Sequence, residues 1–440
     1  MIIHTRRQHA VGQGCFHSGS VGAGPPEAYD PSHLQYVYDC GAMGPYGASL
    51  RAEVNRFLAA GRGGSIDLLF ISHLHLDHVS GVEQLCSGSM AVGTVVLPLL
   101  NDIDRLVCFA RAAAEAPGAI TDFYRDLIAD PTGAITQRLN PDQILYVRRG
   151  EGPAPGGGEL DVPERPDFPR DPGRTRGEER TSKWRLVGRG YAGSEGPQAN
   201  GNVAQSPSAA TPLIGTIDDT NGFEIVTAGE SAAWILAPYV DVEVSAERQS
   251  FIHTVANLLG LSPHEFEQMA SDPHFLLLLI TNCREELAAA YNAVANLNVT
   301  SLCLLSAPYE VQAGSVWRLH RPNPTWAFGY VRRGQKVGWI GTGDADLKKL
   351  ARRKAFLDHY AARLKQIATL LLPHHGSAHN FHEELLDRIR PMVCIAAADA
   401  FSTWQHPGAR VIQAANSRGI PLWVTTGSPR SRTWEAAVSR

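Results

Sequence analysis

The chain has 440 residues, of which 44% are hydrophobic and 19% charged, and this length allows one large domain with insertions or two to three smaller domains. Its net charge of −4 at pH 7 argues against a protein that coats nucleic acid through a global basic field. No apolar run approaches the roughly 20 residues of a membrane span, no secretory signal is recognisable, and seven scattered cysteines suit a reducing compartment, so we expect a cytoplasmic protein that does not enter membranes.

The first hundred residues alternate strand-like runs with glycine-rich turns. Apolar, β-rich runs at 34–41 and 66–73 predict two interior strands. Between them, residues 49–64 have helical spacing and end in glycines. Another strand is expected at 94–100, so this part of the chain predicts an alternation of strands and helices.

The middle of the chain predicts an insertion with three parts. Residues 101–147 have helical spacing interrupted by proline and glycine. Residues 148–221 are rich in Gly, Pro, Ser and charges, and such a segment buries too little apolar surface to offset its ordering entropy. We therefore expect it to be flexible, with one short strand around 183–189. Residues 222–297 return to strand-like and then helical patterns.

The last part of the chain again alternates strands and helices. We therefore expect an α/β (α+β) fold with two halves, residues 1–100 and 298–440, separated by the insertion at 101–297. Protein partners could bind through the insertion, and nothing in the sequence fixes the oligomeric state.

One stretch, LLFISHLHLDHVSG at residues 68–81, places four ligand-type residues within six positions after a predicted strand. They are His73, His75, Asp77 and His78. Neutral imidazoles suit zinc and other late first-row metals, and a carboxylate adds charge for a second ion. We interpret the stretch as a metal site in which His73 and His75 bind one ion and Asp77 and His78 the other. The alternative is a chance polar turn.

This HxHxDH pattern resembles the signature of the metallo-β-lactamase superfamily. The resemblance implies an αββα sandwich with a dinuclear site at one edge of its two sheets, here with the partly helical, partly flexible insertion between the two halves. The run at 34–41 is similar to an early strand of the family. Asp39 at its end is therefore expected to orient a ligand histidine.

Five further motifs are similar, in order, to the metallo-β-lactamase domain of ComEC-type competence proteins. They are AVGQGCF (10–16), TSLCLL (300–305), GWIGTGDAD (338–346), LLLPHHGS (370–377) and QHPG (405–408). This likeness implies that Asp344 bridges two ions and that His375 binds the second ion. It also makes His374 and His406 candidates for contact with the substrate or for proton transfer.

The sequence departs from the family pattern at the first ion. The superfamily usually supplies a third histidine between HxHxDH and the bridging aspartate, but no histidine occurs between His78 and His253. The later candidates are His253, His264 and His274 in helical stretches, and His320 at the end of a strand-like run. Cys15 stands where the ComEC-type subgroup often has aspartate. A centre with a single metal therefore stays open.

Together these residues predict a metal-dependent hydrolase with two divalent ions, Zn²⁺ or alternatively Mn²⁺. Such ions lower the pKa of a bound water from about 15.7 towards about 7 and so supply hydroxide. Asp77 would steady the hydroxide, and His374 or His406 would stabilise developing charge or protonate the leaving oxygen.

The ComEC-type likeness implies a phosphodiester substrate in DNA, RNA or a nucleotide. Two alternatives remain: an ester or thioester hydrolase of the same fold, and a regulatory or binding module of a multi-protein system such as a defence system.

Overall fold

The structure is a computed structural model that describes most of the chain. The described residues are 2–23, 33–61, 64–86, 90–155, 182–188, 191–192, 211–227, 234–242, 246–294, 297–309, 317–320, 332–334, 336–399 and 404–439. Most of the segment predicted to be flexible, 148–221, lies outside them. Within the described part of the chain, every helix is too short or too polar to cross a membrane.

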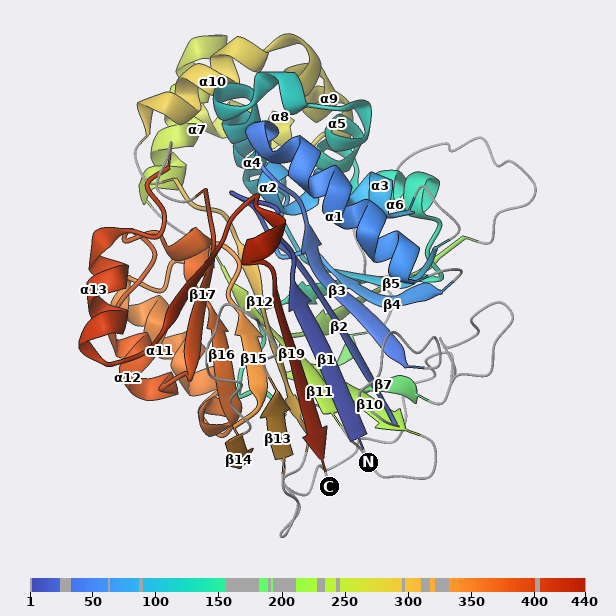
Figure 1. Cartoon of the computed structure of the whole chain (residues 1–440). Coiled ribbons are helices and arrows are strands. Elements are labelled where there is room, and N and C mark those ends of the chain that lie inside the picture. Colours follow the sequence, from blue (N-terminus) through green and yellow to red (C-terminus); the bar gives the residue numbers. More distant parts are fainter. Residues whose placement is uncertain are drawn as a thin grey trace.

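The larger of two β-sheets has the strand order β14-β13-β19-β1-β2-β3-β4-β5-β6-β9-β8 (Figure 1). Its strands are β1 (Ile2–Gln8), β2 (Phe16–Ala23), β3 (Leu34–Cys40), β4 (Ser65–Phe70), β5 (Ala91–Pro98), β6 (Gln143–Arg148), β8 (Tyr191–Ala192), β9 (Leu213–Asp218), β13 (Trp317–His320), β14 (Arg332–Gly334) and β19 (Thr433–Ser439). The strands β3 to β6 and β9 run parallel. The C-terminal strand β19 pairs antiparallel with β1, which joins the two ends of the chain in one sheet.

The smaller sheet has the order β18-β17-β16-β15-β12-β11-β10-β7. Its strands are β7 (Ser182–Gly188), β10 (Asn221–Thr227), β11 (Trp234–Asp241), β12 (Ser301–Pro308), β15 (Gly338–Gly341), β16 (Ile367–Leu371), β17 (Val393–Ala397) and β18 (Leu422–Thr425). Here β15 to β18 are parallel and the other pairs are antiparallel. Each sheet thus has a parallel part, where all strands end at the same edge.

Helices cover the outer face of each sheet. The larger sheet carries α1 (Gly47–Ala60), α3 (Val82–Cys86), α4 (Asp102–Glu115), α5 (Asp122–Ala129) and α6 (Pro131–Leu139), with α2 (Leu76–Val79) at its edge. Against α4 and α5 pack α8 (Pro263–Ala270), α9 (Pro273–Asn282) and α10 (Arg284–Ala293), and α7 (Ala246–Leu259) packs on α8 and α10. The smaller sheet is covered by α11 (Leu350–His359), α12 (Glu384–Ile389) and α13 (Ala409–Ser417). This is the expected αββα sandwich.

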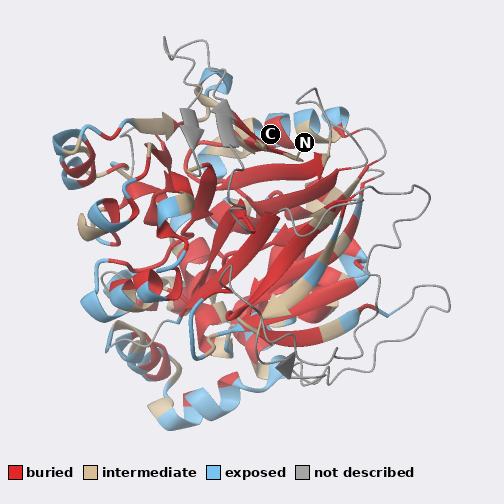
Figure 2. Ribbon diagram, turned by 90° about the horizontal axis from the view of Figure 1, so that it is seen from below, coloured by how far each residue is buried: buried red, intermediate tan, exposed pale blue. Residues whose placement is uncertain are grey.

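Apolar side chains of both sheets fill the space between them. Phe70 of β4 and Phe223 of β10 are both fully buried and meet edge to face, with ring centroids 5.3 Å apart. Leu236 and Trp339 of the smaller sheet belong to the same core. Figure 2 shows most of the strands coloured as buried, while the helices carry exposed residues. Because the faces of both sheets are covered, a functional site is expected in the loops at the ends of the strands.

The strands and helices predicted for residues 34–100 and 298–425 are present, as is the short strand expected around 183–189, which is β7. Residues 101–147 were predicted to be helical, and this is wrong for residues 143–147, which form β6. Strands from residues 101–297 extend both sheets, because β6 and β9 join the larger sheet and β10 and β11 join the smaller one. The division into two halves and an insertion stays a prediction.

Replacing Phe223 by alanine tests how firmly the strands from residues 222–241 belong to the core. We expect Phe223→Ala to lower the free energy of unfolding by about 3–5 kcal/mol, because it empties a buried site against Phe70. Leu213→Ala, at a half-exposed position of β9, should cost less than about 0.5 kcal/mol. Urea denaturation of both variants measures the difference, and equal effects would contradict this packing.

Candidate metal centre

The eight predicted site residues come from four loops at the carboxyl ends of parallel strands, where ligand sites of open α/β sheets usually form. They are His73, His75, Asp77 and His78 after β4, Asp344 after β15, His374 and His375 after β16, and His406 after β17. Segments far apart in the sequence therefore meet at one edge of the sandwich.

Asp344 lies at the centre of this convergence. Its Oδ1 is 3.2 Å from His78 Nε2 and 3.9 Å from His375 Nε2. Its Oδ2 is 3.3 Å from His73 Nε2 and 3.5 Å from His75 Nδ1. One buried carboxylate thus faces imidazoles on both of its oxygens.

Asp77 completes a second group with His78 and His375. Its Oδ2 is 3.2 Å from His375 Nε2. The ligand-type atoms of Asp77, His78 and His375 lie within 4.8 Å of one another, and so do those of His73, His78 and Asp344. Asp77 Oδ1, His78 Nε2 and Asp344 Oδ1 are buried without a hydrogen-bond partner among the described residues. Because buried polar atoms are normally satisfied, these residues fit a bound cation.

A short network behind the cluster fixes two of its imidazoles. Asp39 Oδ2 accepts hydrogen bonds from His78 Nδ1 at 2.7 Å and from the Ser72 hydroxyl at 2.7 Å. Since Ser72 gives its proton to Asp39, its oxygen accepts from His73 Nδ1 at 2.9 Å. Both Nε2 atoms are therefore turned toward Asp344, and Asp39 has the orienting contact expected from the sequence.

The loop after β16 holds its two histidines in an uncommon backbone conformation. His374 (φ 47°), His375 (φ 58°) and Gly376 (φ 85°) follow one another in the left-handed region, where non-glycine residues are strained. His374 N–H donates to Gly343 O at 2.8 Å, and His375 Nδ1 donates to Ala397 O at 2.8 Å. The second bond leaves His375 Nε2 to face Asp77.

His374 and His406 lie at the outer side of the cluster. His374 Nδ1 is 3.1 Å from Asn380 Oδ1, and its Nε2 is 3.5 Å from Asp344 Oδ2. The His406 ring is 5.8 Å from the His374 ring, between centroids. Gln13 Nε2, from the glycine-rich loop between β1 and β2, donates to His406 Nδ1 at 3.2 Å. The sequence did not single out Gln13, although it belongs to the AVGQGCF motif.

Burial and neighbouring positive charges shift the pKa values of the two carboxylates in opposite directions. Burial alone would raise the pKa of Asp77, but Arg111 and His375 outweigh it and hold that pKa well below its ordinary value. For Asp344, burial is likewise outweighed by His374, His73 and His78, which lower its pKa. Desolvation lowers the pKa of His374 to about 4 and that of His406 to about 3. Two ionised carboxylates therefore face two neutral outer imidazoles at neutral pH.

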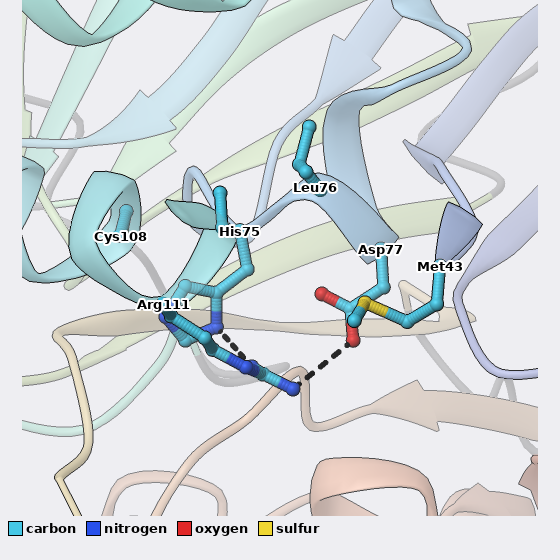
Figure 3. Close-up of a pocket in the computed structure, with 7 residues that line it drawn as sticks. Met43, His75, Leu76, Asp77, Cys108 and Arg111 are labelled. Atoms are coloured by element: carbon cyan, nitrogen blue, oxygen red, sulfur yellow. Dashed lines mark hydrogen bonds and ion pairs between the residues drawn. The ribbon is translucent and has the colours of Figure 1, made fainter. Parts of the chain in front are cut away.

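Arg111 of α4 is a site residue that sequence reasoning missed (Figure 3). Its Nη1 lies 2.5 Å from His75 Nδ1 and 3.4 Å from Asp344 Oδ2, and its Nη2 lies 3.4 Å from Asp77 Oδ2. Burial would lower the pKa of Arg111, but the Asp77 and Glu115 carboxylates raise it well above its ordinary value. The available signal was a charged residue inside the otherwise apolar run LVCFARAAA.

None of the three later histidines in the helices replaces the missing third ligand of the family pattern. His253, His264 and His274 are exposed on α7, α8 and α9. The side chain of His320 lies outside the described part of the structure. Cys15 is buried, and its Sγ lies within 4.8 Å of ligand-type atoms of Asp39 and His78, behind the cluster.

Part of the chain matches a known protein family. Residues 35–167 match the family model of the metallo-beta-lactamase superfamily. The matched range holds the histidine-rich loop after β4 and Arg111, whereas Asp344 and the later histidines lie beyond it. No curated protein matches the chain. The family match and the clusters of metal-ligating side chains together indicate a metal-dependent hydrolase.

The Asp39 network predicts a specific defect in metal binding. We expect Asp39→Asn to weaken binding of Mn²⁺ or Zn²⁺ about 10- to 100-fold, because an amide no longer fixes the His78 ring through a charged acceptor. Isothermal titration measures the affinity. As a control, Glu224→Gln removes a buried carboxylate that pairs with Arg185 between β10 and β7, which carry no residue of the site, and it should leave the affinity unchanged. An Asp39→Asn protein with wild-type affinity would contradict the assigned orientation.

Proposed function

We propose that this protein is a metal-dependent hydrolase of phosphodiesters in DNA, RNA or nucleotides. The observation that carries the proposal is the meeting of four strand-end loops around Asp344 and Asp77, with imidazole nitrogens beside both oxygens of Asp344 and one beside Asp77. The ordered motifs similar to ComEC-type proteins support the phosphodiester class.

In this proposal Asp77, His78, Asp344 and His375 hold a divalent ion, Zn²⁺ or alternatively Mn²⁺. A divalent ion bound there supplies Lewis acidity and an acidified water. His73 and His75 form the other end of the site, where Arg111 Nη1 lies 2.5 Å from His75 Nδ1. Asp77 also accepts a hydrogen bond from the attacking water and so orients it toward the phosphorus.

The two outer histidines take different roles, because their Nδ1 atoms have different partners. The Asn380 carbonyl oxygen accepts a hydrogen bond from His374 Nδ1–H, so the neutral His374 presents a bare Nε2 toward Asp344. The Gln13 amide donates to His406 Nδ1, so the neutral His406 keeps its proton on Nε2. His406 is therefore the group that donates to a phosphoryl or leaving oxygen, and His374 accepts a proton or binds the ion.

Replacing His406 by alanine should impair turnover without emptying the centre. We expect His406→Ala to lower kcat about 10²- to 10³-fold on bis-p-nitrophenyl phosphate, because it removes a neutral N–H that donates a hydrogen bond to the phosphoryl oxygens as charge develops on them. The metal content should stay at the wild-type value. The exposed His253→Ala serves as control and should keep full activity. Unchanged turnover in His406→Ala would remove this residue from the mechanism.

Removal of the metal tests the reaction class. Dialysis against a chelator should abolish phosphodiester hydrolysis, and added Mn²⁺ or Zn²⁺ should restore it. In Asp344→Asn the added ions should not restore hydrolysis, because the carboxylate between the imidazoles is lost. The substrates are linear DNA, RNA and cyclic nucleotides, assayed beside a panel of esters and thioesters. Preference for the thioester panel would show an ester or thioester hydrolase, and a chelated protein with unchanged function would favour a binding module.

A further inference from the structure

Arg111 reaches into the centre from the helical side. It lines a small pocket with Met43, His75, Asp77 and Cys108, and Figure 3 shows its guanidinium between the His75 ring and the Asp77 carboxylate. Only 6% of its side chain is exposed. A buried guanidinium is costly unless it is paired, and here carboxylates face it from the β4 and β15 loops and from its own helix.

The position of this guanidinium conflicts with an ion at the His73–His75 end. His75 Nδ1 is the ring atom that faces Asp344 Oδ2, and it is also the atom nearest Arg111 Nη1, at 2.5 Å. One nitrogen lone pair can accept an N–H or bind a cation, but it cannot do both. His75 Nδ1 also lies 2.9 Å from His73 Nε2, so these two imidazoles could bind an ion together only if the guanidinium moved away.

We propose that Arg111 takes the place of one of the two ions, so that the centre holds a single divalent ion together with a fixed guanidinium. The inference rests on the metal centre of the proposed function. The ion lies with Asp77, His78, Asp344 and His375, and Arg111 supplies the positive charge at the His73–His75 end.

The charges of the site agree with this arrangement. Three buried carboxylates surround the cluster, those of Asp39, Asp77 and Asp344. One divalent ion and one guanidinium balance them, whereas two divalent ions beside the same guanidinium would leave an excess of positive charge in a buried site. Glu115 also pairs with Arg111, but on its more exposed side, at 3.2 Å from Nε.

Arg111 acts as a positioning residue rather than a direct substrate contact. Its Nε, Nη1 and Nη2 already face Glu115, His75 with Asp344, and Asp77 respectively. It therefore holds both carboxylates in place, and it also explains why the chain tolerates the lack of a third histidine for the first ion.

Counting metal ions per chain tests the inference. Full-length protein is loaded with excess Mn²⁺, desalted and measured by inductively coupled plasma mass spectrometry. We expect one ion per chain in the wild type and in Arg111→Lys, and two ions in Arg111→Met and Arg111→Gln. Arg105→Met is the control, because Arg105 lies on the same helix but binds Asp102 and backbone oxygens outside the site; it should keep one ion.

Electron paramagnetic resonance gives a second readout that does not depend on activity. The wild type should show an isolated Mn²⁺ signal, and Arg111→Met a spin-coupled pair. Two ions in the wild type would overturn this inference. A single ion in folded Arg111→Met and Arg111→Gln proteins would overturn it as well. Both outcomes would leave the proposed hydrolase function intact. A wild type that binds no ion would overturn both proposals. If neither variant folds, the count in the wild type decides.

Discussion

The structure depends on a buried carboxylate, Asp344, that contacts imidazoles on both of its oxygens. A buried charge of this kind is strongly unfavourable unless cationic or hydrogen-bonding groups surround it. The chain meets this constraint with Arg111 and with histidines whose outer nitrogens are fixed by Asp39, Ser72 and backbone oxygens. The electrostatics and the geometry of the centre therefore follow from one requirement, which is to keep a carboxylate ionised away from water.

The arrangement of strands in the sandwich brings the groups that surround Asp344 together. Parallel strands end together, so the loops after β4, β15, β16 and β17 meet without long connections. The packing of Phe70 on Phe223 holds the two sheets together, and the pairing of β19 with β1 places both ends of the chain in the larger sheet. The helical layer contributes as well, because α4 positions Arg111 against the loop after β4. The centre is consequently built by both sheets and by one outer helix.

The site residues that could be predicted from the sequence are those that stand in short motifs. The cluster from His73 to His78, Asp344 and His375 stands in short motifs directly after apolar strands, and strand ends of a parallel sheet share an edge. Asp39 could be placed for the same reason. In these cases neighbouring residues in the sequence carry the whole signal, and the sandwich brings the residues together as the motifs imply.

Arg111 and the first strand, β1, could not be predicted from local patterns. Arg111 lies on an apolar helical face, and only the docking of α4 shows that its charge is satisfied by loops from other parts of the chain. In β1 the buried side carries His4 and Arg6, a pattern that reads as an exposed strand or a loop. Arg6 is paired with Glu435 of β19, a partner from the opposite end of the chain.

The most direct test of the central claim is a crystal structure of the Mn²⁺-loaded protein with anomalous scattering recorded. We predict an anomalous peak within bonding distance of His78, His375, Asp77 and Asp344. Peaks confined to exposed histidines such as His253, or no peak at the edge of the sandwich, would contradict it.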